Sequence, residues 1–215
     1  MNLQELIAAY RAQSKDSCEP FLADDGLLTI YANEAQVEAC RRGQLLVGTV
    51  FVEAKAGAED VALPANAIRV IRASVGGQPL EGITADGMDT IFCGWQDHGN
   101  RAQPRYLVSG INTSKLNLWP RPDVDCSIRL TLQLLPSKRL ASLTNDSPEI
   151  RPEMHPALVE WMLYKVYSQT DSDLFDPSKA AFALANFEAE FGRKSSGRNE
   201  TWVRQGDGLM PGPIA

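Results

Sequence analysis

Apolar and polar residues follow a helical period near the start of the chain. A capping-box pattern before an apolar stripe predicts a short helix over residues 3–13. A second helix is predicted from Asp24 or Asp25 to about Arg42, with Gly43 as the residue that stops it. The N-terminal part of the chain is therefore predicted to be helical.

The helical period returns near the C-terminus. An almost continuously apolar segment predicts a third helix over residues 156–169. Asp176 followed by Pro177 is typical of a helix start, and Gly192 is typical of a helix end. These signals predict a fourth helix over residues 177–191.

Between the two helical parts, the period changes to that of β-strands. Short segments rich in β-branched and aromatic residues are separated by Gly, Pro, Asn and Asp. In "SIRLTLQLL", apolar and polar residues alternate, as expected of a strand with one buried face. Six strands are predicted, at residues 45–54, 67–75, 88–95, 105–110, 115–120 and 127–136.

Together these elements predict an α+β fold. A helical bundle built from the N- and C-terminal helices would carry an inserted antiparallel β-sheet or sandwich domain. The predicted parts are a bundle of residues 1–43 and 150–192, a β-domain of 44–137, a connector of 138–149 and an extended C-terminal arm of 193–215.

Charge and composition narrow the function classes. The 215 residues carry a net charge of −6, which argues against a general nucleic-acid binder. No apolar run approaches the roughly 20 residues that cross a bilayer, and the first residues lack a secretory pattern. Four widely spaced cysteines predict reduced, mostly buried thiols. The expectation is a soluble protein that folds in a cytoplasm.

Two glutamates on the second helix are the first candidates for chemistry. Glu34 and Glu38 lie four residues apart, and paired carboxylates can act as acid and base in a hydrolase. Arg41 and Arg42 lie within one helical turn of Glu38, however, and ion pairs explain the same spacing. We interpret the cluster as ion pairs that set packing register.

Other catalytic and metal-binding patterns are missing from the sequence. His155 and His98 are isolated, and there is no GxSxG, Walker-type or GxGxxG motif. No enzyme activity, metal or cofactor is therefore predicted. The alternative function is a ligand- or glycan-binding β-domain protein of a virion or tail, and a ligand bound in a pocket around Trp95 and His98 would favour it.

The third helix is apolar on two faces. One face, together with neighbouring helices, would fill the bundle core. The predicted core residues are Leu28, Tyr31, Ala35, Trp161, Tyr164, Leu184, Phe187 and Phe191. The other face carries Val159, Met162, Leu163 and Val166, which we predict to be covered by a neighbouring subunit. A completely intramolecular bundle is the alternative.

Basic residues follow the fourth helix, with Trp202 among them. An aromatic side chain among cations can stack on single-stranded nucleic acid and neutralise it. An arm that docks on an acidic partner surface explains the same residues equally well.

Two long segments resemble a known family. "FLADDGLLTIYANEAQVEACRRGQLL" is similar to the N-terminal signature of tailed-bacteriophage head-to-tail adaptor (connector) proteins, most like those of short-tailed phages. "EIRPEMHPALVEWMLYKVYSQTDSDLFDPSKAAFALANFEAEFG" is similar to that family's C-terminal helical pair, and "KLNLWPRPD" resembles the element between them. Clear matching covers about half of the chain, at both ends.

The resemblance implies a structural virion protein of the neck between capsid and tail, made in the host bacterial cytoplasm. Its copies, usually twelve, would form a homo-oligomeric ring that docks under the portal protein and extends the DNA channel. Packaged DNA would pass through the lumen without sequence-specific binding, and tail nozzle and fibre proteins would be anchored. The predicted inter-subunit or portal contacts are Glu34, Glu38, Arg41, Arg42, Val159, Met162, Leu163, Val166, Arg193, Lys194, Arg198, Trp202 and Arg204.

Overall fold

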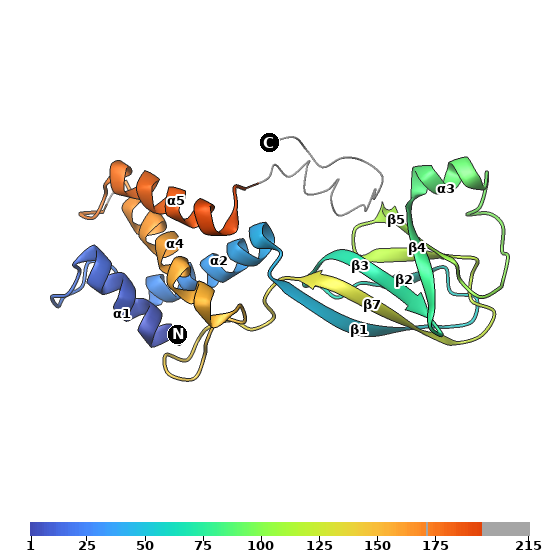
Figure 1. Ribbon diagram of the computed structural model, residues 1–215, viewed down its shortest axis with the longest axis horizontal. Helices are drawn as coiled ribbons and strands as arrows, with labels where there is room; N and C mark the ends of the chain where they lie inside the picture. The colour runs from blue at the N-terminus through green and yellow to red at the C-terminus, as the bar shows by residue number, and fades with distance from the viewer. Residues whose placement is uncertain (171, 195–215) are drawn as a thin grey trace. The chain divides into compact units, whose positions relative to one another are not determined.

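The computed structural model describes residues 1–170 and 172–194, which form two compact units (Figure 1). The helical unit contains residues 1–46 and 135–194, and the β unit contains residues 47–134. The predicted α+β organisation, in which helices from both ends of the chain pack together, is confirmed.

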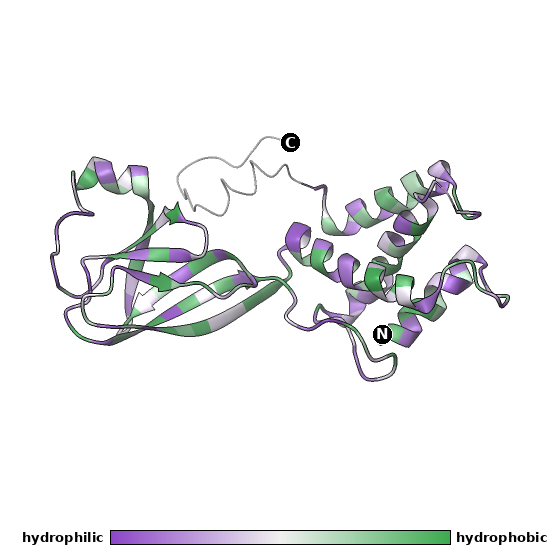
Figure 2. Ribbon diagram, turned by 180° about the vertical axis from the view of Figure 1, so that it is seen from behind, coloured by the Kyte–Doolittle hydropathy of each residue, from purple (hydrophilic) through white to green (hydrophobic). Residues whose placement is uncertain are grey.

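The helical unit is built from four α-helices and one 3-10 turn. They are α1 (Leu3–Ser14), α2 (Asp25–Gly43), η1 (Pro152–Met154), α4 (His155–Tyr167) and α5 (Pro177–Phe191). Helix α4 packs against α1, α2 and α5, so it has helical neighbours on several sides. Figure 2 shows the hydrophilic and hydrophobic bands that alternate along these helices.

The helix ends follow from local side-chain caps. Asp24 caps α2 by accepting a hydrogen bond from the backbone N–H of Leu27 at 2.7 Å. Gly43 was predicted to stop this helix, but it is the last helical residue, and Gln44 takes the left-handed conformation at φ 53°. Asp176 caps α5 through the backbone N–H groups of two residues after it.

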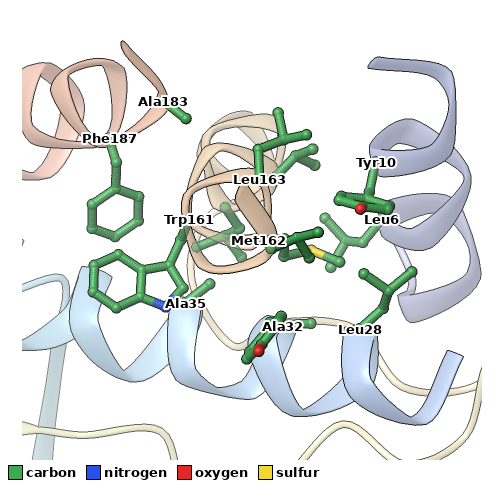
Figure 3. Close-up of a cluster of buried hydrophobic side chains, with 14 of the residues drawn as sticks. Leu6, Tyr10, Leu28, Ala32, Ala35, Trp161, Met162, Leu163, Ala183 and Phe187 are labelled. Atoms are coloured by element: carbon green, nitrogen blue, oxygen red, sulfur yellow. The ribbon is translucent and has the colours of Figure 1, made fainter. Parts of the chain in front are cut away.

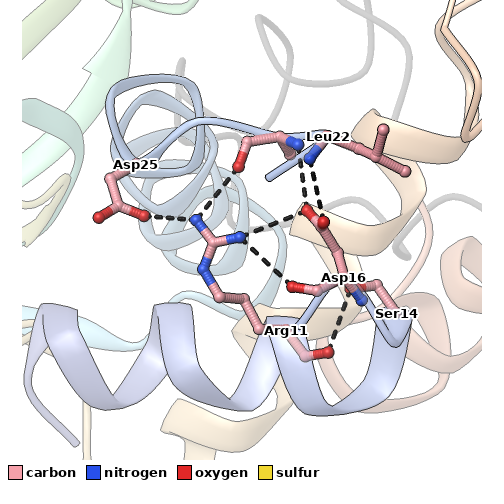
Figure 4. A network of polar contacts seen from close by, with 6 residues as sticks. Arg11, Ser14, Asp16, Leu22 and Asp25 are labelled. Atoms are coloured by element: carbon pink, nitrogen blue, oxygen red, sulfur yellow. Dashed lines mark hydrogen bonds and ion pairs between the residues drawn. The ribbon is translucent and has the colours of Figure 1, made fainter. Parts of the chain in front are cut away.

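A buried ion pair organises the loop between α1 and α2 (Figure 4). The carboxylate of Asp16 accepts backbone hydrogen bonds from Leu22 at 3.0 Å and Ala23 at 3.1 Å. The guanidinium of Arg11 contacts Asp16 at 3.3 Å and Asp25 at 2.6 Å. The loop is therefore fixed to the end of α1 and the start of α2.

Two buried amides fix the connector that follows the β unit. The side chain of Asn33 exchanges two hydrogen bonds with the backbone of Leu140, at 2.8 and 2.9 Å. Gln36 donates to the backbone carbonyl of Lys138 at 3.1 Å. Leu140 is buried in the core cluster of the helical unit, so the connector contributes to the core.

The β unit is one sheet of seven strands. The elements are β1 (Leu46–Ala54), β2 (Asp60–Ala62), β3 (Ala67–Val75), β4 (Gln78–Thr84), α3 (Ala85–Ile91), β5 (Tyr106–Asn112), β6 (Lys115–Trp119) and β7 (Cys126–Leu134). The strand order is β1-β7-β3-β4-β5-β6-β2. The sheet curves into a near-barrel whose inner residues, such as Ile128, Leu130 and Leu132, are buried.

The sheet differs from the predicted one in three ways. Residues 88–95 were predicted to be a strand, but residues 85–91 form α3 because the hydroxyl of Thr84 caps it through the N–H of Gly87. The short strands β2 and β4 were not predicted. The chain then returns through α3 and a loop, so β4 and β5 pair in parallel. The pairs β2–β6, β3–β4, β3–β7 and β5–β6 are antiparallel.

The hairpin between β3 and β4 has the glycine pair that its geometry requires. Val75 pairs with Gln78, which leaves Gly76 and Gly77 as a two-residue turn with φ of 55° and 84°. Glycine tolerates positive φ because it lacks a Cβ atom. The turn therefore sets the register of β3 and β4.

Candidate functional site

The second apolar face of α4 is enclosed by the chain itself. Val159, Met162, Leu163 and Val166 are at most 6% exposed and belong to one core cluster with side chains of α1, α2, α5 and the connector. Figure 3 shows Met162 and Leu163 beside Leu6 and Tyr10 of α1. The prediction that a neighbouring subunit covers these four residues is wrong, because side chains of the same chain already enclose them.

The residues predicted to fill the bundle core lie in or against that same cluster. Six are buried members of it: Leu28, Tyr31, Ala35, Trp161, Phe187 and Phe191. Tyr164 and Leu184 are partly buried and pack against it. The aromatic rings of Trp161 and Phe187 have their centroids 5.0 Å apart, which joins α4 to α5.

Glu38, Arg41 and Arg42, all predicted as contact residues, form one cluster of ion pairs within the chain. The carboxylate of Glu38 contacts Arg41 at 2.9 Å and Arg42 at 3.1 Å. Arg42 also reaches Glu188 of α5 at 3.6 Å and donates to the carbonyl oxygen of Gly192 at 3.5 Å. Its largely buried guanidinium therefore links the end of α2 to the end of α5.

Two aromatic rings of the core make cation–π contacts with the guanidinium of Arg42. Its guanidinium lies 5.2 Å from the ring centroid of Trp161 and 5.3 Å from that of Phe187. Cation–π contacts of this kind favour arginine over lysine, since the planar guanidinium stacks on aromatic faces. Arg42 thus contacts residues of α2, α4 and α5 and helps to hold these helices together.

Glu34 is placed differently from Glu38. Its carboxylate is partly exposed and forms an ion pair with Lys165 of α4 at 3.0 Å. Each of the two glutamates is thus neutralised by its own cation or cations. This arrangement fits packing, whereas a hydrolase would need one carboxylate free to take up a proton.

An exposed stripe runs along the opposite side of α2. Ile30, Glu34 and Val37 stand at positions i, i+4 and i+7, so they share one helix face, and both apolar members are exposed. We call these three residues the outer stripe. The helical period places Ile30 and Val37 opposite the core face, and this is the signal by which sequence reasoning could have identified them as contact residues.

The chain matches a known family along nearly its whole length. The family model described as "SU10 adaptor protein" matches residues 1–208, which include both units. The chain belongs to this family of phage head-to-tail adaptors. The adaptor is therefore a structural protein of the phage connector, and the family implies no enzymatic role. No curated protein matches it.

Only the start of the adaptor's C-terminal arm lies within the described residues. Arg193 is almost completely exposed, with its guanidinium 3.9 Å from Glu188, and Lys194 is exposed as well. Arg198, Trp202 and Arg204, which were also predicted as contacts, lie outside the described residues, as does most of the predicted extended arm.

Trp95 and His98, which were considered for a ligand pocket in the β unit, do not line the same cavity. Trp95 lines a cavity of about 240 Å³ together with Asn117 and Trp119, and its indole N–H donates to Asp89 at 2.9 Å. His98 instead contacts the carbonyl oxygen of Gly94 at 2.8 Å and does not line that cavity.

Neither a group of metal-ligating side chains nor a membrane-spanning helix is found in the described part of the chain. Within residues 1–170 and 172–194, no group of three or more His, Cys, Asp or Glu side chains is placed to hold a metal ion. No helix in the described part of the adaptor is both long and apolar enough to cross a membrane.

The four cysteines of the adaptor are free thiols with different environments. Cys40 is buried, but Cys18 and Cys93 are exposed and Cys126 is intermediate, so the prediction of mostly buried thiols is wrong. Burial raises the pKa of Cys40 to about 12, and the nearby negative charge of Glu149 acts in the same direction.

These environments predict selective alkylation. With iodoacetamide at pH 8, Cys18 and Cys93 should react in the folded adaptor, whereas Cys40 should react only after unfolding, because it is both inaccessible and protonated. Peptide mass spectrometry after timed quenching measures the rates. Labelling of Cys40 as fast as Cys18 would contradict the core that is described here.

Proposed function

We propose that the adaptor assembles into a ring, usually of twelve copies, beneath the portal of a phage. The ring extends the DNA channel and anchors tail nozzle and fibre proteins in the virion neck. The family match over residues 1–208 carries this proposal, since it includes both the helical unit and the β unit. The net charge of −6 also fits a channel wall that repels DNA phosphates.

The outer stripe is the proposed contact with the next copy. A closed ring needs two different surfaces on each subunit, because head-to-tail contacts join unlike patches. The outer stripe offers two exposed apolar side chains around Glu34, while Arg193 and Lys194 are exposed cations at the end of α5. The two surfaces thus differ in chemistry, as a head-to-tail contact requires.

Portal binding and ring formation are tested by measuring the molar mass of the complex in solution. Light scattering is measured for the adaptor alone, for the portal alone and for their mixture. The expected result is a complex that contains about as many adaptor copies as portal subunits. An adaptor whose mass is unchanged by the portal, in a mixture that shows no complex, would contradict the proposed function.

A variant pair tests the outer stripe separately. Ile30→Asp with Val37→Asp should fold normally by circular dichroism, since both side chains are exposed, but it should lose ring formation on the portal. Ile71→Asp, at an exposed position of β3, is the matched control and should assemble. Normal assembly of the double variant would refute the stripe contact while leaving the ring function standing.

A further inference from the structure

Strand β1 stands at one end of the sheet and has an apolar outer face. Its nine residues have β7 as their one strand neighbour among the described residues. The side chains of Val50 and Val52 pack into the core of the β unit. On the other face, Val47 is 60% exposed and Phe51 is 65% exposed. The strand therefore offers both apolar side chains and a row of backbone groups.

An edge of this kind is unusual in a folded protein. Open edges pair with other chains, and natural sheets protect them with short strands, charges, proline or a covering segment. The opposite edge follows this rule, since β2 has three residues and Asp60 is paired with Lys115 at 3.0 Å. Strand β1 has no proline and one charged residue, Glu53. It therefore requires a covering segment.

The end of the described chain lies beside the route into β1. Arg42 donates to the carbonyl oxygen of Gly192 at 3.5 Å, and β1 begins at Leu46, four residues after Arg42. The chain beyond Gly192 thus starts next to the segment that leads into the edge strand. Residues 193–215 can span about 75 Å at roughly 3.3 Å per residue, more than twice the length of β1.

One stretch of that segment has the composition of a strand. "NETWVRQ", residues 199–205, contains Thr, Trp and Val, which favour strands, and lies between glycine-containing stretches. Residues 195–215 lie outside the described residues, so only their sequence bears on this point. In an extended strand, Trp202 would share one face with Glu200 and Arg204, because side chains alternate with a period of two.

We propose that residues 199–205 pair in parallel with the outer edge of β1 of the same chain, as an additional strand. Both segments start from the contact between Arg42 and Gly192 and would run in the same chain direction. Phe51 follows Arg42 by nine residues, and Trp202 follows Gly192 by ten. Alignment of Phe51 with Trp202 brings two aromatic rings together. The same register places Arg204 opposite Glu53, the one charge on β1.

Amide hydrogen exchange tests the pairing in the full-length adaptor. Val203→Pro removes a backbone N–H and breaks the proposed strand, and Ser196→Pro is a matched control outside it. Alternate amides of β1 should exchange at least about tenfold faster in Val203→Pro than in the wild type or the control. Equal exchange of β1 in all three proteins would overturn the proposal.

An engineered disulfide tests the register of the added strand and whether that strand belongs to the same chain. Cys18, Cys93 and Cys126 are first replaced with serine, and Glu53→Cys is combined with Arg204→Cys. Mild oxidation should give a disulfide within one chain, seen as a faster-migrating monomer at every dilution. The control Glu53→Cys with Glu200→Cys should not form it, because the two positions would lie four residues out of register.

Two results of that experiment would overturn the proposal. A disulfide that joins two chains would show that the covering strand comes from another copy. Absence of a disulfide in both pairs, in a protein whose circular dichroism is unchanged, would show that the segment does not lie on this edge.

Discussion

Replacement of Asp16 with alanine is expected to destabilise the helical unit by about 3–5 kcal/mol, the range for removing one partner of a buried ion pair. The side chain of Asp16 is 2% exposed and accepts two backbone hydrogen bonds besides its contact with Arg11. Without it, the guanidinium of Arg11 and the N–H groups of Leu22 and Ala23 lose a buried acceptor. Urea unfolding followed by circular dichroism at 222 nm measures the loss.

The same guanidinium supplies a matched control. Asp25 also contacts Arg11, at 2.6 Å, but its side chain is 54% exposed. Asp25→Ala should cost less than about 1 kcal/mol, because exposed ion pairs contribute little. Equal losses in the two variants would mean that burial of Asp16 does not decide the stability of this loop.

Truncation of Phe187 is expected to have a similarly large effect. This ring is fully buried and lies between Trp161 and Phe191, with centroid distances of 5.0 and 4.7 Å. Phe187→Ala should lower the free energy of unfolding of the helical unit by about 3–5 kcal/mol, since it loses apolar burial and leaves a cavity. The ring also supports Arg42, so the link between α2 and α5 should loosen.

The control for this variant lies on the same helix. Phe182 is 69% exposed, so Phe182→Ala removes the same group from α5 without opening a cavity. Its effect on unfolding should stay within about 0.5 kcal/mol. Comparable losses for both variants in urea unfolding would contradict the assignment of Phe187 to the core. A change in portal binding by Phe182→Ala alone would instead mark this side chain as a contact.

Helix positions were predictable because their signals are local. Asp176, Pro177 and Gly192 bracket α5 within the sequence itself, and the structure places this helix at Pro177–Phe191 as predicted. The strand predicted at residues 88–95 was wrong because a local signal, a helix cap, was overlooked. Its β-branched and aromatic residues resemble a strand, but the hydroxyl of Thr84 starts a helix just before it.

The covering of α4 could not be predicted, because it depends on distant contacts. The connector reaches the bundle through Asn33 and Leu140, which are 107 positions apart in the chain. Nothing in the periodicity of α4 distinguishes a face covered by α1 of the same chain from one covered by another subunit. The ion pair between Glu38 and Arg42 was predicted from spacing, whereas the contact of Arg42 with α5 needed the three-dimensional structure.

The two chain crossings between the units have a mechanical consequence. The backbone passes from Leu46 to Val47 and again from Leu134 to Leu135, at the first residue of β1 and the last of its neighbour β7. Tension between the units is thus shared by two backbone connections. They pull β1 and β7 at the same end and in the same direction. Such a load does not shear β1 from β7, so the adaptor can transmit force while this strand pair stays intact.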